Sequence, residues 1–144
     1  MRLFRDISNI CGETSPGFLS NCIMKEKKLL IVDDEPDILE FLKKCLERNN
    51  FKVIAASSGR ECLDKASQEE PDLILLDIVM PFMDGYEVIK KLRNNRRTKH
   101  IPIVMHSVKK ETRSIFRCME LGSIDYVTKP ISVDVLVKVI RRYV

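Results

Sequence analysis

Three aspartates, one lysine and one serine stand directly after, or at the end of, short apolar runs. The aspartates are Asp33, Asp34 and Asp77, and the other two residues are Ser107 and Lys129. Carboxylates held within a few ångströms of one another repel unless a cation neutralises them, and Mg²⁺ prefers oxygen ligands of this kind. An ionised aspartate beside a lysine and Mg²⁺ can act as a nucleophile toward a phosphoryl group. These residue types therefore predict Mg²⁺-dependent phosphoryl chemistry, provided that the fold brings them together.

The elements that would position these residues alternate along the chain. Mostly apolar runs at 29–32, 51–56, 73–76 and 101–105 predict four strands, and the short segment 125–128 predicts a fifth. Helical spacing follows each of them, with helices over 85–93 and 111–120 and a last one capped by Ser132. This alternation predicts an α/β fold with a parallel sheet. Ligands of an open parallel sheet bind at the carboxyl ends of its strands, so the five side chains should converge on one rim.

Length and composition restrict the class of protein. The 144 residues are 44% hydrophobic and 32% charged, which is typical of one soluble globular domain. No apolar run is long enough to span a membrane, and no signal peptide is recognisable, so a cytoplasmic protein is expected. The five cysteines show no C-x-x-C spacing, which argues against a zinc or redox motif. The net charge of +4 is too small to imply nucleic-acid binding by itself.

Two segments differ from the rest in composition. Residues 1–24 contain glycine, proline and several serines with weak periodicity, and they are interpreted as a flexible N-terminal extension to a domain at 25–144. The segment 90–99 carries six basic residues and no acidic one, which invites a nucleic-acid interpretation. Because no aromatic residues interleave with these cations, a basic helix end followed by a solvated loop is favoured.

Three motifs in order resemble a known family. The segment 28–39 reads K-L-L-I-V-D-D-E-P-D-I-L, 77–86 reads D-I-V-M-P-F-M-D-G-Y, and 125–130 reads D-Y-V-T-K-P. Together they are similar to the receiver domains of response regulators, and the resemblance covers about residues 27–144. It implies a flavodoxin-like, doubly wound, five-stranded parallel sheet with strand order 2-1-3-4-5.

The resemblance also implies a role for each residue of the acidic rim. Asp77 would accept the phosphoryl group from a histidine kinase or a phosphotransfer protein. Asp34, Asp77 and the backbone carbonyl of Val79 would bind Mg²⁺, and Asp33 would act mainly through a metal-bound water. Lys129 would pair with the phosphoryl oxygens, and its peptide bond to the following proline is expected to be cis.

A second set of residues would transmit the signal. The resemblance implies that the hydroxyl of Ser107 moves onto a phosphoryl oxygen and that Tyr126 follows it inward as an aromatic switch. The switched surface would span 108–144, where a downstream protein or a second copy of the chain would bind. Because the last predicted helix ends at the end of the sequence, a stand-alone regulator is expected, with no DNA-binding module attached.

Ser107, which replaces a more frequent threonine, and Val108 depart from the family pattern, and two alternatives stay open. Val108 stands where a small residue is usual and could crowd Asp77, while Val79 offers no polar group to orient water, which predicts slow self-dephosphorylation.

One alternative is a Mg²⁺-dependent phosphatase of the haloacid-dehalogenase kind, which is disfavoured because it needs an acid at the position of Val79. The other is a module that binds its partner without phosphorylation. The main hypothesis is therefore a signalling module and not an enzyme.

Overall fold

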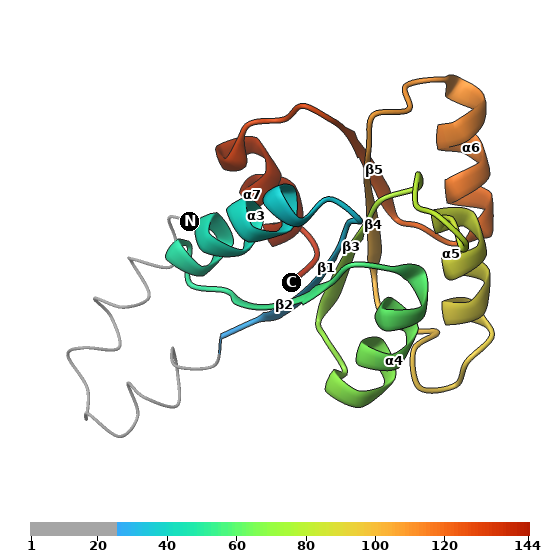
Figure 1. Cartoon of the computed structure of the whole chain (residues 1–144), viewed down its shortest axis with the longest axis horizontal. Coiled ribbons are helices and arrows are strands. Elements are labelled where there is room, and N and C mark those ends of the chain that lie inside the picture. The colour runs from blue at the N-terminus through green and yellow to red at the C-terminus, as the bar shows by residue number, and fades with distance from the viewer. Residues whose placement is uncertain (1–25) are drawn as a thin grey trace.

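A five-stranded parallel sheet forms the centre of the protein. The computed structural model describes residues 26–144, and the predicted extension at 1–24 lies outside them. The strands are β1 Lys28–Val32, β2 Lys52–Ala56, β3 Leu73–Leu76, β4 Ile103–Ser107 and β5 Asp125–Thr128, and the helices are α3 Pro36–Arg48, α4 Gly59–Glu69, α5 Gly85–Arg93, α6 Thr112–Leu121 and α7 Val133–Arg141. The strand order is β2-β1-β3-β4-β5 (Figure 1). The predicted α/β class, the parallel pairing and the order 2-1-3-4-5 are confirmed.

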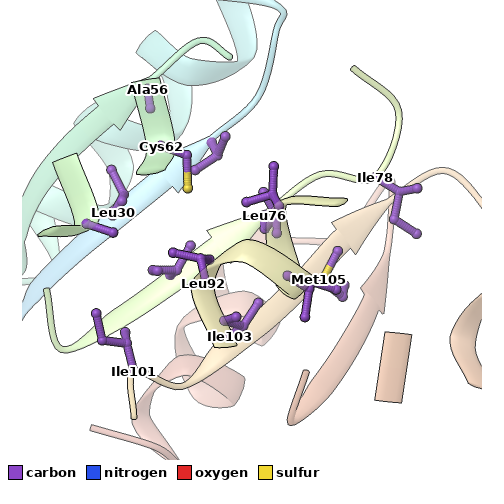
Figure 2. Packing of buried hydrophobic residues seen from close by; sticks show 14 of the residues in the cluster. Leu30, Ala56, Cys62, Leu76, Ile78, Leu92, Ile101, Ile103 and Met105 are labelled. Atoms are coloured by element: carbon purple, nitrogen blue, oxygen red, sulfur yellow. The ribbon is translucent and has the colours of Figure 1, made fainter. Parts of the chain in front are cut away.

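Two hydrophobic cores cover the two faces of the sheet. Helices α3 and α7 lie on one face, and α4, α5 and α6 lie on the other (Figure 1). Strands β1 and β3 are central, so their side chains alternate between the cores and are buried on both sides, as expected of parallel strands. Figure 2 shows the core beneath α4 and α5, where Leu30, Leu76 and Leu92 meet. Cys62 and Cys118 are free thiols buried in this core.

Side-chain caps fix the points at which the chain turns from strand into helix. The Ser58 hydroxyl accepts a hydrogen bond from Glu61 N, the Asp84 carboxylate accepts one from Glu87 N, and the Ser132 hydroxyl accepts one from Val135 N. Helix α3 begins instead with Pro36, whose missing N–H costs nothing in the first helical turn. These helix starts lie on the rim formed by the carboxyl ends of the strands.

The fourth strand begins two residues later than predicted. The sequence indicates a strand over 101–105, but β4 runs from Ile103 to Ser107. The N–H of Ile101 donates to the carbonyl of Thr98 in a turn, and Pro102 has no N–H to give to a sheet. The strand therefore continues through His106, and Ser107 is its last residue. The second strand begins at Lys52 and not at Phe51, because the Phe51 N–H closes the preceding helix on Leu46.

Candidate functional site

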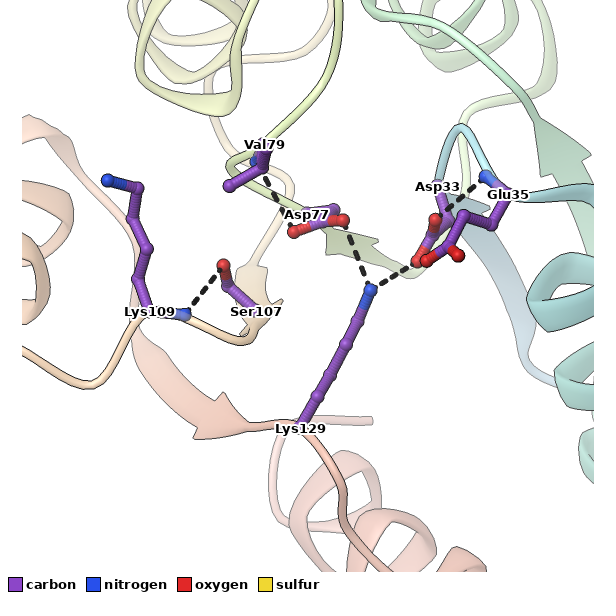
Figure 3. Close-up of polar contacts among 7 residues, drawn as sticks. All are labelled: Asp33, Glu35, Asp77, Val79, Ser107, Lys109 and Lys129. Atoms are coloured by element: carbon purple, nitrogen blue, oxygen red, sulfur yellow. Dashed lines mark hydrogen bonds and ion pairs between the residues drawn. The ribbon is translucent and has the colours of Figure 1, made fainter.

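The carboxyl ends of four strands bring together most of the residues singled out from the sequence. Asp33 follows β1, Asp77 follows β3, Ser107 ends β4 and Lys129 follows β5. Backbone hydrogen bonds hold this rim in register, since Asp77 N donates to Val32 O at 3.2 Å and Lys129 N donates to Ser107 O at 2.8 Å. The Lys129–Pro130 bond is cis, as predicted. Figure 3 shows the side chains of Asp33, Asp77 and Lys129 turned toward one another, while the Ser107 hydroxyl faces the backbone nitrogen of Lys109.

Lys129 bridges two buried carboxylates. Its ammonium nitrogen lies 2.5 Å from Asp33 Oδ2 and 3.1 Å from Asp77 Oδ2 (Figure 3). Burial alone would lower the pKa of Lys129, but hydrogen bonds and charge from the two aspartates outweigh it, so the net shift is upward. Burial raises the pKa of Asp77, and although Lys129 opposes this effect, repulsion from Asp33 adds to it. The site is therefore a carboxylate pair that one lysine only partly neutralises.

The acidic cluster has the composition of a site for a hard divalent cation. Asp33, Asp34 and Asp77 each offer a carboxylate oxygen, and these oxygens all lie within 4.8 Å of one another. Asp33 and Asp77 are buried, while Asp34 is exposed and has no hydrogen bond or ion pair to any residue from 26 to 144. Three carboxylates against one lysine leave an excess of negative charge, so the residues fit Mg²⁺, which takes oxygen ligands and keeps several waters.

Val79 has a backbone carbonyl that fits the same interpretation. Its N–H donates to Asp77 Oδ1 at 3.4 Å, which places the Val79 backbone nitrogen beside the Asp77 carboxylate (Figure 3). Its carbonyl accepts no hydrogen bond from the residues that the structure describes. A carbonyl without a partner at the edge of an acidic cluster is suited to bind a cation. The Val79 side chain is half exposed and apolar.

Gly85 is a site residue that the sequence reasoning missed. A Cβ atom at this position would lie 2.5 Å from the Asp77 carbonyl oxygen and 2.7 Å from Ile78 Cα. The Gly85 N–H donates to the Ile78 carbonyl at 2.8 Å, so the start of α5 rests directly against the backbone that carries Asp77. Only glycine permits this approach. The glycine in the 77–86 motif was the available signal.

Ser107 and Tyr126 are connected through the backbone of Lys109. The Lys109 N–H donates to Ser107 Oγ at 3.3 Å, and the Lys109 carbonyl accepts a hydrogen bond from the Tyr126 hydroxyl at 2.7 Å. Figure 3 shows Lys109 beside Ser107 at the end of β4. Burial is the main cause that raises the pKa of Tyr126 to about 12, so this hydroxyl remains a donor. No residue pattern points to Lys109, because its backbone and not its side chain makes both contacts.

Two further residues next to Ser107 have clear positions. His106 is buried within β4, next to Ser107, and burial with a contribution from Lys129 lowers its pKa to about 4. Its imidazole is therefore neutral at pH 7. Val108 is exposed at the start of the loop after β4. Among residues 26–144, no helix is long and apolar enough to cross a membrane.

The sequence model of the response regulator receiver domain family matches residues 29–141 of this chain. The chain belongs to this family. Receiver domains are the signalling modules of two-component systems, and the three motifs at 28–39, 77–86 and 125–130 lie within or at the edge of the matched region. The sequence-based resemblance is confirmed.

Relatives and solved structures agree with this membership. The chain is 46% identical over 119 residues to the alkaline phosphatase synthesis transcriptional regulatory protein PhoP of Bacillus subtilis, covering 81% of this chain and 49% of that protein. It is 34% identical over 114 residues to protein PilH of Pseudomonas aeruginosa, covering 79% of this chain and 94% of PilH. The chemotaxis protein CheY4 of Vibrio cholerae superposes with a TM-score of 0.80 at 29% identity, covering 83% of this receiver and all of the CheY4 chain. The receiver spans about half the length, or less, of relatives such as PhoP and ResD.

Proposed function

We propose that this receiver domain accepts a phosphoryl group on Asp77 from a histidine kinase or a phosphotransfer protein, in a reaction that requires Mg²⁺. The observation that supports this most strongly is the position of Lys129 between Asp33 and Asp77, within a cluster of three carboxylates. Because one lysine does not neutralise three carboxylates, the cluster favours binding of a divalent cation. The bound cation and Lys129 would then attract an anionic phosphoryl group. A cytoplasmic location is part of the proposal.

Each residue of the cluster has a task in this transfer. The Asp77 carboxylate attacks phosphorus while the bond from phosphorus to the donor nitrogen breaks, which leaves an acyl phosphate on Asp77 and the donor histidine free. Bound Mg²⁺, held by Asp33, Asp34, Asp77 and the Val79 carbonyl, would supply positive charge where the phosphoryl oxygens arrive. Lys129 already lies 3.1 Å from Asp77 Oδ2, and it would exchange this contact for a phosphoryl oxygen.

The signal would leave the site through Lys109. When the Ser107 hydroxyl turns onto a phosphoryl oxygen, it loses its present hydrogen bond from Lys109 N. The Lys109 carbonyl holds the Tyr126 hydroxyl, so a shift of this loop moves the aromatic side chain as well. The receiver would thus have two conformations that differ in these contacts, and the phosphoryl group would stabilise only the one in which Ser107 contacts it. The surface at 108–144 would then bind a downstream protein or a second copy of the chain.

Of the relatives named above, only PilH offers a pattern for a receiver that acts without an attached output domain, and we include that form in the proposal. The match covers nearly all of PilH, whereas PhoP continues well beyond the matched region. The phosphatase alternative is not favoured, because Val79 stands where an acid would be needed and its side chain is apolar. The alternative in which a partner binds without phosphorylation gives no function to the two carboxylates that Lys129 bridges.

The test is phosphorylation with a small donor. The full chain is incubated with acetyl phosphate and Mg²⁺, and the intact protein is weighed by mass spectrometry. We expect one added phosphoryl group in the wild type and none in Asp77→Asn, and no labelling of the wild type when EDTA removes Mg²⁺ before the donor is added. Asp72→Asn, which changes an exposed aspartate at the opposite end of β3, is the matched control and should be labelled normally. Equal labelling of wild type and Asp77→Asn would refute the site.

A further inference from the structure

A groove between α5 and α6 lies outside the acidic cluster. It has a volume of about 480 Å³ and contains three basic side chains, Lys90 and Lys91 from α5 and Arg117 from α6. The sequence alone shows Lys90 and Lys91 as part of the basic segment 90–99 but gives no reason to group them with Arg117. The fold brings the three cations into one concave surface.

The basic segment divides into a structural part and a surface part. The Arg93 guanidinium turns inward and donates hydrogen bonds to the carbonyls of Lys99, Ile101 and Gly122 at 2.8 to 3.2 Å. Lys90 and Lys91 are exposed, and neither forms an ion pair with any residue from 26 to 144. The predicted basic helix end is present, but one of its cations, Arg93, serves the fold while the other two lie on the surface.

Arg117 is held in place without being neutralised. Its guanidinium carbon lies 4.0 Å from the centroid of the Tyr86 ring, a cation–π contact that orients the side chain but leaves its N–H groups free to bind an anion. Within the described part of the chain it has no carboxylate partner. The groove thus presents one positioned guanidinium and two mobile ammonium groups.

The acidic side chains of the groove lie toward the start of α5. Asp84 uses its carboxylate to cap the helix at Glu87 N, at 3.0 Å, so part of its charge is directed at the helix terminus. Glu87 is exposed and one turn from Lys90 and Lys91. The groove is therefore acidic near the start of α5 and basic farther along the helix.

We infer that this groove is a docking site for an acidic peptide segment of a partner protein. The carboxylates of the segment would lie over Lys90, Lys91 and Arg117, because these cations have no partner within the described chain and charge complementarity favours a flexible anionic ligand. A nucleic acid fits less well. Glu87 would repel a continuous line of phosphates, and Tyr86 is buried beneath Arg117 and offers no free face for a base to stack on.

The inference is tested by peptide binding to the full chain. The probe is fluorescein-labelled hexaglutamate, followed by fluorescence anisotropy at low ionic strength. We expect Lys90→Glu combined with Lys91→Glu to weaken binding roughly tenfold or more, which corresponds to about 1.4 kcal/mol. The matched control is Arg96→Glu combined with Arg97→Glu, which changes the net charge equally on exposed residues that do not line the groove; a change of less than about threefold is expected there. Thermal unfolding checks that both variants fold.

A second variant, expected to strengthen binding where the first weakens it, makes the test more specific. Glu87→Gln removes one of the two acidic groups of the groove, the one that does not cap α5, and should tighten binding of hexaglutamate, whereas a merely non-specific attraction would respond to Glu120→Gln on α6 just as strongly. Asp77→Asn should bind the peptide as the wild type does, so this site can fail or succeed independently of phosphorylation. Three outcomes would each overturn the inference. They are no binding of the peptide by the wild type, an equal loss of binding in the two charge-reversed pairs, and tighter binding of a single-stranded oligonucleotide that carries the same charge as the peptide.

Discussion

Lys129 is the residue on which the buried part of the acidic cluster depends. It contacts both Asp33 and Asp77, and its side chain is only 10% exposed. Lys129→Met would leave two buried carboxylates facing each other without a counter-ion, and we expect a loss of about 3 kcal/mol in the free energy of unfolding without Mg²⁺. Urea denaturation measures this, with Lys138→Met on the exposed side of α7 as the control. Equal losses in the two variants would contradict the assignment of Lys129 as the counter-ion.

If Asp77 is phosphorylated as proposed, Val79 should determine how long the phosphoryl group remains. Its apolar side chain is half exposed beside Asp77 and has no group that could hold an attacking water in line. We expect slow self-dephosphorylation in the wild type and faster loss, by roughly tenfold, in Val79→Asn, which adds a water-binding amide of similar size. The decay of label after removal of acetyl phosphate is the measurement, and Val79→Ala is the control for a change in size alone. A wild-type half-life of seconds would argue against this role.

His106 should make stability depend on pH without taking part in the chemistry. Its ordinary pKa of 6.5 falls to about 4 in the folded protein, because burial disfavours the charged imidazole. Between these values the unfolded chain binds more protons than the folded one, so stability falls as the pH falls. We expect the wild type to lose about 2 kcal/mol more than His106→Leu between pH 7 and pH 5. Urea denaturation at the two pH values tests this, and parallel losses would exclude the histidine as the cause.

At the scale of elements, Arg93 joins the end of α5 to two loops. Its guanidinium donates four hydrogen bonds to the carbonyls of Lys99, Ile101 and Gly122. Gly122 ends α6 with a φ of +123°, and a Cβ atom there would lie 2.8 Å from Arg93 Nε, so glycine is needed for conformation and for space.

Arg93→Met should therefore destabilise the fold. It leaves three carbonyls without their partner in a partly buried setting, and we expect a loss of about 3 kcal/mol in the free energy of unfolding. Arg97→Met, on an exposed neighbour, should change stability by less than about 0.5 kcal/mol. Urea denaturation of both variants is the measurement. If Arg93→Met unfolded at the same urea concentration as the control, the carbonyl contacts would not be stabilising.

Some boundaries of the strands could be predicted from the sequence, and others could not. The ends of β1 and β3 were predictable, because apolar runs stop where Asp33 and Asp77 begin. The end of β5 was predictable from Lys129 and the proline that follows it. The start of β4 was not, since the apolar residue at 101 belongs to a turn that Arg93 and Thr98 hold from outside the strand. The roles of Gly85 and Lys109 depend on backbone atoms, and residue types alone do not reveal contacts of this kind.

At the scale of the whole molecule, the acidic cluster connects segments that are far apart in the chain. Asp33 and Asp34 lie between β1 and α3, and Asp77 lies between β3 and α5. Their mutual repulsion opposes folding, while a cation that binds only the folded arrangement stabilises it. Stability of the domain and occupancy of the site should therefore be linked.

Mg²⁺ should raise the stability of the folded domain, and Asp34 should determine by how much. At a Mg²⁺ concentration 100 times the dissociation constant, the expected gain is about 2.7 kcal/mol. Asp34→Asn removes an exposed ligand without emptying a core position, so it should unfold at an equal or higher temperature without Mg²⁺ but gain much less when Mg²⁺ is added. Asp37→Asn, an exposed residue in the first turn of α3, is the control and should gain as much as the wild type. Thermal unfolding with MgCl₂, against NaCl at matched ionic strength, separates specific binding from screening. If the gain were the same in Asp34→Asn, or were reproduced by NaCl, the three carboxylates would not be acting together as a cation site.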